Sequence, residues 1–141
     1  MAEEKKRLCM VVFDGTVDKL YPVSIMTSGA VMNDVRVDIF LTFWGLMAFR
    51  KGEPYKVQAV SKDYEDQAAQ MMAVMQEKKV PHWYDTLLQA KELGDVHVHA
   101  CAMTADLFGL TKEDFEPVIE DIIGVGEFIE MTQDASSTLF I

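Results

Sequence analysis

Three short segments with strand character alternate with longer segments of helical spacing, and this alternation constrains the fold more than any other feature of the chain. The strand-like segments are residues 8–13, 35–41 and 96–101. Each is short and rich in apolar and β-branched residues. Strands that alternate with helices predict a parallel sheet covered on both faces. We therefore expect an α/β fold of flavodoxin-like type, a three-layer α/β/α sandwich with a mainly parallel sheet of about five strands.

The helices follow from the spacing of apolar residues and from their start and stop signals. The helix over residues 17–32 should stop at Asn33, and the helix over residues 81–93 should have Pro81 at its first position and Gly94 as its cap. Val118 and Ile119 read only as an apolar patch. The remaining expected elements are helices over residues 43–50, 64–79, 102–108 and 125–132, a loop over residues 51–62, and a last strand over residues 138–141.

Length and charge limit the kinds of partner. A chain of 141 residues is accounted for by one domain over residues 1–141. Its formal net charge of −10 disfavours binding to nucleic acid or anionic lipid, which needs clustered Lys and Arg. The longest uncharged run, residues 39–49, is shorter than the roughly 20 apolar residues of a membrane span. Residues 1–7 are charged and lack the apolar core of a signal peptide. We therefore expect a cytoplasmic protein with no membrane span.

Cys101 is the strongest candidate for a reactive residue. It ends a predicted strand, and Ala102 opens a predicted helix, so its sulfur should lie near unpaired backbone N–H groups. Such surroundings favour the reactive thiolate. The alternative is a small buried apolar residue. With only two cysteines in a cytosolic chain, we expect no structural disulfide, which favours catalytic or redox use of one thiol.

Cys9 is expected to be a core residue. It lies four residues before the end of its predicted strand, about 13 Å from the edge where Cys101 should lie. A disulfide needs Cα atoms within about 7 Å, so the two thiols should be out of reach of each other.

Three loops should meet at the carboxyl edge of the sheet, because parallel strands end on the same side. Ligands bind at this edge in open α/β sheets. Each member also has a structural alternative, since Gly15 could only make a turn, Thr42 could only cap a helix, and Trp44 could belong to the core. The predicted site consists of the nucleophile Cys101 and the pocket residues Asp14, Gly15, Thr16, Thr42, Trp44, Gly45, Ala102, Met103 and Thr104.

His97 and His99 should share one strand face with Cys101, because side chains alternate with period two. Such a set could bind zinc or copper, but the pattern is short, and we predict no metal site, with these two histidines as the only candidates. Their alternative is a pocket or a subunit contact. The nearby acidic residues are expected to be solvated and without catalytic role: Glu113, Asp114, Glu116, Glu120 and Asp121.

A methionine-rich face on the predicted helix over residues 64–79 has two interpretations. Its members are Ala68, Ala69, Met71, Met72 and Met75. Core packing is the interpretation we favour. An oligomer interface is the alternative, because flexible methionines suit such surfaces.

Residues 11–19, 38–46 and 100–110 together resemble the DsrE/DsrF-like family, in particular the DsrE-like branch labelled peroxiredoxin-family. The resemblance implies a flavodoxin-like sandwich, homo- or hetero-oligomers, and sulfur carried as a persulfide on Cys101. It also implies TusA-like sulfur carriers or rhodaneses as partners. We expect no cofactor.

We therefore interpret the chain as a cytoplasmic sulfur carrier or sulfurtransferase that works as a homo-oligomer. Two alternatives stay open, a non-catalytic ligand- or metal-binding module and a structural subunit of a larger complex. A thiol peroxidase is not favoured, because no second cysteine should reach Cys101.

Overall fold

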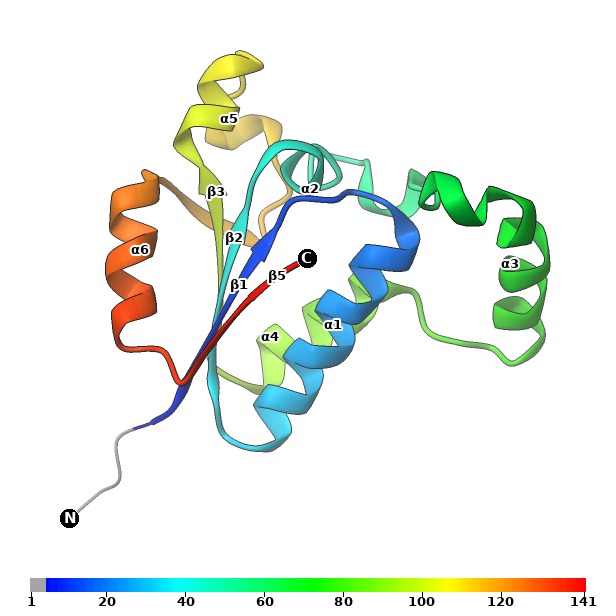
Figure 1. Ribbon diagram of the computed structural model, residues 1–141, viewed down its shortest axis with the longest axis horizontal. Coiled ribbons are helices and arrows are strands. Elements are labelled where there is room, and N and C mark those ends of the chain that lie inside the picture. The colour runs from blue at the N-terminus through cyan, green and yellow to red at the C-terminus, as the bar shows by residue number, and fades with distance from the viewer. Residues whose placement is uncertain (1–4) are drawn as a thin grey trace.

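The computed structural model describes residues 5–141, and its centre is a five-stranded parallel sheet (Figure 1). The strands are β1 (Arg7–Val12), β2 (Arg36–Leu41), β3 (Val96–Cys101), β4 (Ile119–Ile123) and β5 (Ser137–Phe140). They lie in the order β4-β3-β2-β1-β5, and all neighbouring strands are parallel. Helices cover both faces of the sheet, so the predicted α/β/α arrangement is confirmed.

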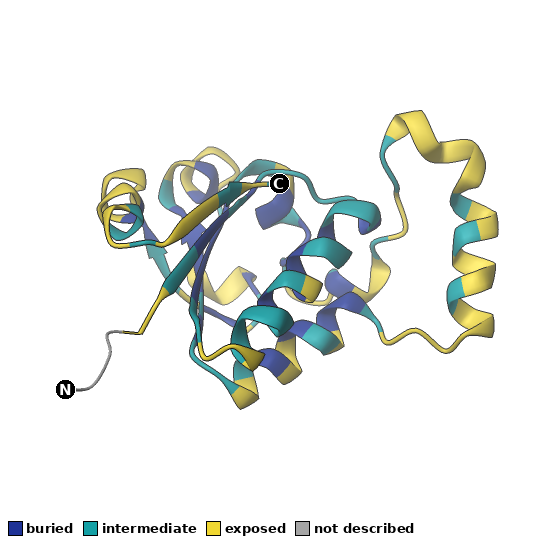
Figure 2. Ribbon diagram, turned by 60° about the horizontal axis from the view of Figure 1, so that its bottom comes forward, coloured by how far each residue is buried: buried dark blue, intermediate teal, exposed yellow. Residues whose placement is uncertain are grey.

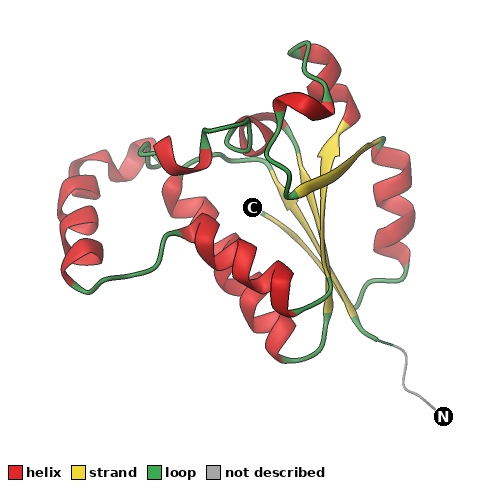
Figure 3. Cartoon of the chain, turned by 180° about the vertical axis from the view of Figure 1, so that it is seen from behind, coloured by secondary structure: helices red, strands yellow, loops and turns green. Residues whose placement is uncertain are grey.

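The strand order explains which face each helix covers. The chain steps in one direction from β1 through β2 to β3, and right-handed crossovers place α1 (Val17–Met32) and α4 (Trp83–Leu93) on the same face. It then returns across the sheet from β4 to β5, so α6 (Val125–Gln133) lies on the opposite face (Figures 1 and 3). The short helices α2 (Phe43–Met47) and α5 (Ala102–Leu107) lie at the carboxyl edge.

The two faces of the sheet have different cores. The larger core packs α1 and α4 against the sheet around Trp83, Leu20 and Ile39. The smaller core lies under α6 and contains Cys9, Phe40, Cys101, Ile123 and Phe128. In it, the Phe40 and Phe128 rings stack with centroids 4.7 Å apart. Cys9 is fully buried, which confirms its predicted place in the core.

The segment between α2 and α4 extends away from the sheet (Figures 1 and 2). It contains two 3-10 turns, η1 (Pro54–Lys56) and η2 (Lys62–Gln67), followed by α3 (Ala68–Glu77). The helix expected over residues 64–79 therefore begins as a 3-10 turn. None of the residues of α3 is buried, so core packing of Met71, Met72 and Met75 is wrong. The expected loop over residues 51–62 holds η1 and turns.

Several element boundaries differ from expectation for local reasons. Ile119 of the apolar patch begins β4, whereas Val118 lies in the turn before it. The register of β4 against β3 shifts by one residue at Glu120. Helix α4 begins at Trp83 rather than at Pro81, because His82 caps it by accepting the Tyr84 N–H at its Nδ1, 3.0 Å away. The predicted stop at Asn33 and the cap at Gly94 are both found.

One helix and one strand differ from expectation by a few residues at one end. The helix expected over residues 43–50 ends at Met47, and the last strand begins at Ser137. Among residues 5–141, no helix combines the length and the apolar character that a membrane crossing requires. Of the residues in the expectation about residues 1–7, residues 1–4 lie outside the described part of the chain.

Candidate functional site

Cys101 is the last residue of β3 and the N-cap of α5. The predicted passage from strand to helix at this thiol is therefore present. Alternation along β3 turns the side chain toward the α6 face, where it packs with Phe40, Ile123 and Phe128. The residue is only 5% exposed. Apolar side chains surround it on the sheet side, and the start of α5 adjoins it at the edge of the sheet.

Two threonine hydroxyls lie beside Cys101. Thr104, from the first turn of α5, is fully buried, and its Oγ1 accepts the backbone N–H of Phe43 at 3.0 Å. The Oγ1 of Thr42 lies 3.2 Å from that of Thr104. Because the Phe43 N–H donates to it, the Thr104 hydroxyl keeps its own proton free to donate to a neighbour. The end of β2 and the start of α5 thus join at the cysteine.

The alternative role for Thr42, a helix cap, is not what the structure shows. Thr42 occupies the N-cap position of α2, but its hydroxyl makes no capping bond. The following residue, Phe43, has a φ of 47°, a left-handed conformation that is unfavourable for a bulky side chain. This backbone turn aims the Phe43 N–H at Thr104 instead of continuing the strand.

These donors decide the ionisation of Cys101. Burial by itself would raise the pKa of the thiol, but the Thr104 hydroxyl and N–H, the Thr42 hydroxyl and the Met103 N–H favour the thiolate more strongly. The pKa of Cys101 is therefore lowered from its ordinary value.

Cys9 has the opposite character. Burial raises the pKa of its thiol, and the negative charge of Asp38 adds to the effect. Both cysteines are free. Cys9 pairs in register with Asp38, and Asp38 with His97, which is four residues before Cys101. This offset is about 13 Å along the strands, so the predicted separation of the two thiols holds.

The loop after β1 packs against the start of α2 through backbone contacts. A Cβ on Gly15 would lie 2.3 Å from the Trp44 carbonyl oxygen, and a Cβ on Gly45 would lie 2.3 Å from the Val12 carbonyl oxygen. Glycine is required at both positions, because neither backbone oxygen can move aside cheaply. Gly15 therefore does more than make a turn.

The predicted pocket divides into two neighbouring parts. Asp14, Gly15, Thr16 and Trp44 line a cavity of about 290 Å³, together with Met47, Ala48, Arg50, Glu53 and Val57. Cys101 is not among these lining residues. It lies instead with Thr42, Thr104 and the backbone of Met103. Gly45 is buried between the two parts, and Ala102 connects Cys101 to α5.

Exposed apolar side chains surround this edge of the sheet. Trp44 is 53% exposed, so its alternative role in the core is wrong. Its ring lies 6.2 Å from that of Phe108, measured between centroids. Exposed Met103, Leu107 and Val125 extend the same surface, which we call the apolar rim together with Trp44 and Phe108. A rim of this kind is typical of surfaces that bind other proteins.

A charged network occupies the α6 face of the sheet near the amino ends of the strands. Asp38 is fully buried, and its carboxylate accepts bonds from Arg7 (2.8 Å), Arg36 (2.9 Å) and His99 Nε2 (2.9 Å). Burial would raise the pKa of Asp38, but these bonds and the two guanidinium charges hold it well below its ordinary value.

His97 and His99 are the centre of this network, on the strand face where they were expected. Their rings are nearly parallel, with centroids 6.5 Å apart. A hydrogen bond joins His97 Nδ1 to Glu120 Oε1 at 2.8 Å, and another joins His99 Nδ1 to Asp121 Oδ1 at 2.6 Å. The expectation that these two acidic residues are merely solvated is therefore wrong. Burial would lower the pKa of His99, but Asp38 and Asp121 outweigh it and raise that pKa.

Sequence reasoning missed the contribution of Asp38, Arg7 and Arg36. The sequence does contain a signal for a buried charge network, because Asp38 is a charged residue inside an otherwise apolar strand. A buried carboxylate requires partners. The identity of those partners depends on strand register and could not be read along the chain.

The comparison with protein-family models identifies one family. The model of the DsrE/DsrF/DrsH-like family matches residues 4–73 and 58–140. The uncharacterized protein YrkE of Bacillus subtilis is 32% identical over 162 aligned positions, which cover 100% of both chains. The sulfur carrier protein DsrE2 of Allochromatium vinosum is 26% identical over 159 aligned positions, which cover 98% of this chain and 99% of that protein.

Solved structures with the same architecture include two proteins of low sequence identity. The ychN protein from E. coli has a TM-score of 0.61 at 15% identity, with 98% of this chain and 100% of that chain covered. Protein MTH1491 from Methanobacterium thermoautotrophicum, of unknown function, has a TM-score of 0.60 at 12% identity, with 96% and 99% covered. These two show a shared fold. The family match over nearly the whole chain and the identity to YrkE show that this chain belongs to the DsrE/DsrF/DrsH-like family.

Proposed function

We propose that this protein is a sulfur-relay protein that carries sulfane sulfur as a persulfide on Cys101 and exchanges it with thiols of partner proteins. Family membership and the similarity to a protein named as a sulfur carrier support a role in sulfur relay. The observation that carries the assignment to Cys101 is its position at the end of β3, where hydroxyl and N–H donors favour the thiolate. Cys9 offers no comparable site, because it is fully buried in the middle of β1 and burial raises the pKa of its thiol.

The transfer needs no oxidant or reductant beyond the sulfur donor. The Cys101 thiolate attacks the outer sulfur of a donor persulfide or polysulfide, a new S–S bond forms, and the donor sulfur chain leaves as a thiolate. In the second step an acceptor thiolate attacks the outer sulfur, and Cys101 leaves as a thiolate. A thiol of lowered pKa is a good leaving group, so the donors around Cys101 favour release of sulfur as well as its capture.

Each residue near Cys101 has a defined part in this proposal. The hydroxyls of Thr104 and Thr42 and the N–H groups of Met103 and Thr104 stabilise the negative charge on sulfur. Asp14, Gly15 and Trp44 shape the adjoining cavity. The outer sulfur of a persulfide lies about 2 Å beyond Sγ, which extends the reach of a cysteine that is only 5% exposed.

We propose a TusA-like carrier or a rhodanese as the exchange partner. The apolar rim offers such a protein a docking surface around the cysteine. We also propose that the protein is cytoplasmic. We propose that it forms a homo-oligomer, since α3 leaves Met72 and Val74 exposed and Met71 and Met75 only half-buried on the segment that extends from the sheet.

Intact-mass spectrometry after treatment with polysulfide tests the assignment. The native protein should gain about 32 Da per bound sulfur, and dithiothreitol should remove the added mass. Cys9→Ser serves as the matched control, because it removes the other thiol and should load like the native protein. Equal loading of Cys101→Ser, or loading that requires Cys9, would refute the proposal. An unaltered cellular role for Cys101→Ser would favour the alternative of a structural subunit.

A further inference from the structure

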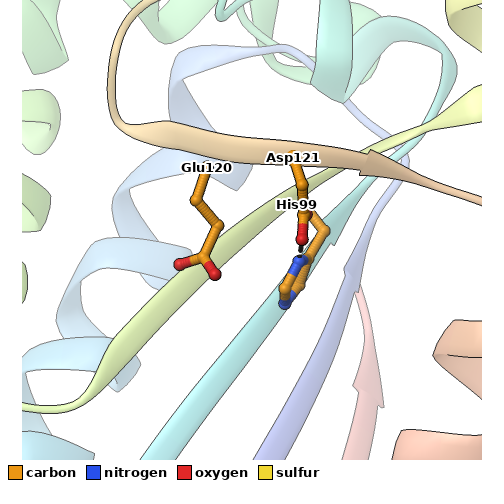
Figure 4. Close-up of side chains that lie close together, drawn as sticks. All are labelled: His99, Glu120 and Asp121. Carbon is orange, nitrogen blue, oxygen red and sulfur yellow. Dashed lines mark hydrogen bonds and ion pairs between the residues drawn. The ribbon is translucent and has the colours of Figure 1, made fainter.

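The charged network on the α6 face contains a second potential site, which the sulfur chemistry does not use. Figure 4 shows His99, Glu120 and Asp121 converging from the neighbouring strands β3 and β4. One possible ligand atom from each of these residues lies within 4.8 Å of the other two. His99 is buried, whereas the side chains of Glu120 and Asp121 are 38% and 45% exposed, so an ion can reach them from solvent.

The orientation of His99 is determined by its two neighbours. Its Nε2 lies 2.9 Å from Asp38, and its Nδ1 lies 2.6 Å from Asp121. Asp38 already accepts bonds from Arg7 and Arg36, so it is an ionised acceptor and holds the proton on Nε2. This arrangement leaves Nδ1 as the nitrogen that faces Asp121. A carboxylate that binds the far nitrogen of a histidine is the usual support of a metal-ligating histidine.

His97 repeats the same arrangement one step along the strand face. Its Nε2 lies 2.6 Å from Asp95, and its Nδ1 lies 2.8 Å from Glu120. Both histidines thus direct Nε2 toward an aspartate and Nδ1 toward an acidic residue of β4. Two such pairs side by side are more specific than a single His–Asp contact.

A β-bulge brings the two carboxylates to the same face. Val98 pairs with Ile119, and His99 pairs with Asp121, so Glu120 is an extra residue in β4. Ile119 packs with Val98 in the core under α1 and α4. In a regular strand consecutive side chains point to opposite faces, so only one of Glu120 and Asp121 could then face α6. Bulges of this kind redirect a side chain and are frequent beside functional sites.

We propose that His99, Glu120 and Asp121, with His97 beside them, bind a divalent first-row transition-metal ion of the zinc class. A mixed set of imidazole nitrogen and carboxylate oxygen suits such ions, whereas calcium and magnesium prefer oxygen alone. Binding would release the proton that His99 Nδ1 shares with Asp121. The neutral imidazole and the two carboxylates then carry a charge of about −2, which a divalent ion balances. The ammonium of Lys91, 3.8 Å from Glu120, is the nearest competing cation, and Arg7 and Arg36 are paired with Asp38.

This site is separate from Cys101. His99 and Cys101 are two residues apart on one face of β3, a distance of about 7 Å along the strand. The sulfur faces Thr104, Thr42 and the start of α5 rather than the acidic residues of β4. The proposed ligands are therefore nitrogen and oxygen atoms, in place of the two histidines and the thiol considered from the sequence. The proposal does not rest on sulfur carriage.

Calorimetric titration of Zn²⁺ into the tag-free, metal-free full chain tests the site. It is performed on Cys101→Ser, so that the thiol cannot bind the ion, and one equivalent of Zn²⁺ should bind. Adding Glu120→Gln and Asp121→Asn should weaken the affinity at least about 10-fold. The matched control adds Glu127→Gln and Glu130→Gln, two exposed residues of α6, and should change it less than about 2-fold.

Absorption of bound Co²⁺ gives a second readout on the native protein. The visible bands should be those of a nitrogen and oxygen site, without a thiolate-to-metal charge-transfer band. His99 is left intact, because its replacement would leave Asp38 short of a partner in the core. Absence of Zn²⁺ binding to Cys101→Ser, equal affinity in the acidic variant and its control, or a thiolate band that depends on Cys101 would each overturn the proposal.

Discussion

Replacing Thr104 by valine removes one hydroxyl beside Cys101 with little change in side-chain volume. Thr104 is fully buried and belongs to the set of groups that favour the thiolate, so Thr104→Val should raise the pKa of Cys101. A hydrogen bond to a charged group contributes about 1.5–3 kcal/mol, and about 1.36 kcal/mol corresponds to a tenfold change in the thiolate fraction. At a pH below the midpoints of both proteins, the thiolate fraction should therefore fall about 10- to 100-fold.

The rate should fall less than the thiolate fraction. A more basic thiolate is intrinsically more nucleophilic, with a Brønsted slope of about 0.4–0.5. About half of the loss on a logarithmic scale is thereby recovered, so alkylation at a pH below both midpoints should slow about 3- to 10-fold. Above the new midpoint the same argument predicts a faster plateau for Thr104→Val than for the native protein.

The assay is iodoacetamide alkylation from pH 5 to 10, followed at Cys101 by mass spectrometry with a chelator present. Thr27→Val is the matched control, because Thr27 is an equally buried threonine whose hydroxyl donates to Val23 at 2.7 Å within α1. Thr104→Ser keeps the hydroxyl and should behave like the native protein. An unchanged midpoint in folded Thr104→Val, or the same shift in Thr27→Val, would refute the role of this hydroxyl.

Three further predictions concern the native thiol, the loop contact and the assembly. Because the pKa of Cys101 is lowered, its alkylation should rise with pH and level off with a midpoint below the free value of about 8.5; a midpoint at or above that value contradicts the site geometry. Gly45→Ala places a Cβ 2.3 Å from the Val12 oxygen and should lower the free energy of unfolding by about 1–3 kcal/mol. Gly29→Ala, which meets nothing within 4 Å in α1, should raise it by up to about 1 kcal/mol in urea titrations; equal effects would argue against the contact. Light scattering should give a mass above the 15.9 kDa of one chain, and a stable monomer would count against the oligomer.

The positions of the main elements were predictable from local patterns. The strand before Cys101 and the helix after it are visible in the sequence, because an alternating segment is followed directly by good helix formers. The carboxyl edge as the place of the thiol then follows from the parallel sheet alone.

Strand β4 was not predictable in the same way. Its sequence places Glu120 and Asp121 next to each other, and the bulge at Glu120 breaks the alternation by which a strand is recognised. The role of these two residues depends on the pairing of His99 with Asp121, which is a register between strands and leaves no trace along one of them.

The immediate surroundings of Cys101 depend on tertiary contacts. The approach of Thr42 and Thr104 requires the left-handed turn at Phe43, which local propensity disfavours for a bulky residue. Trp44 was open to a core role because its residue type is usually well buried, yet the turn places it at the surface.

Transfer of sulfur from Cys101 to an acceptor protein tests the central claim most directly. The protein is loaded with polysulfide, freed of excess reagent and mixed with a reduced TusA-like carrier, and the intact masses of both chains are followed over time. We predict that about 32 Da leaves this chain and appears on the carrier, with no transfer from Cys101→Ser and normal transfer from Cys9→Ser. Sulfur that stays on the loaded chain, or that is released only as sulfide while the carrier keeps its mass, would contradict a relay through Cys101.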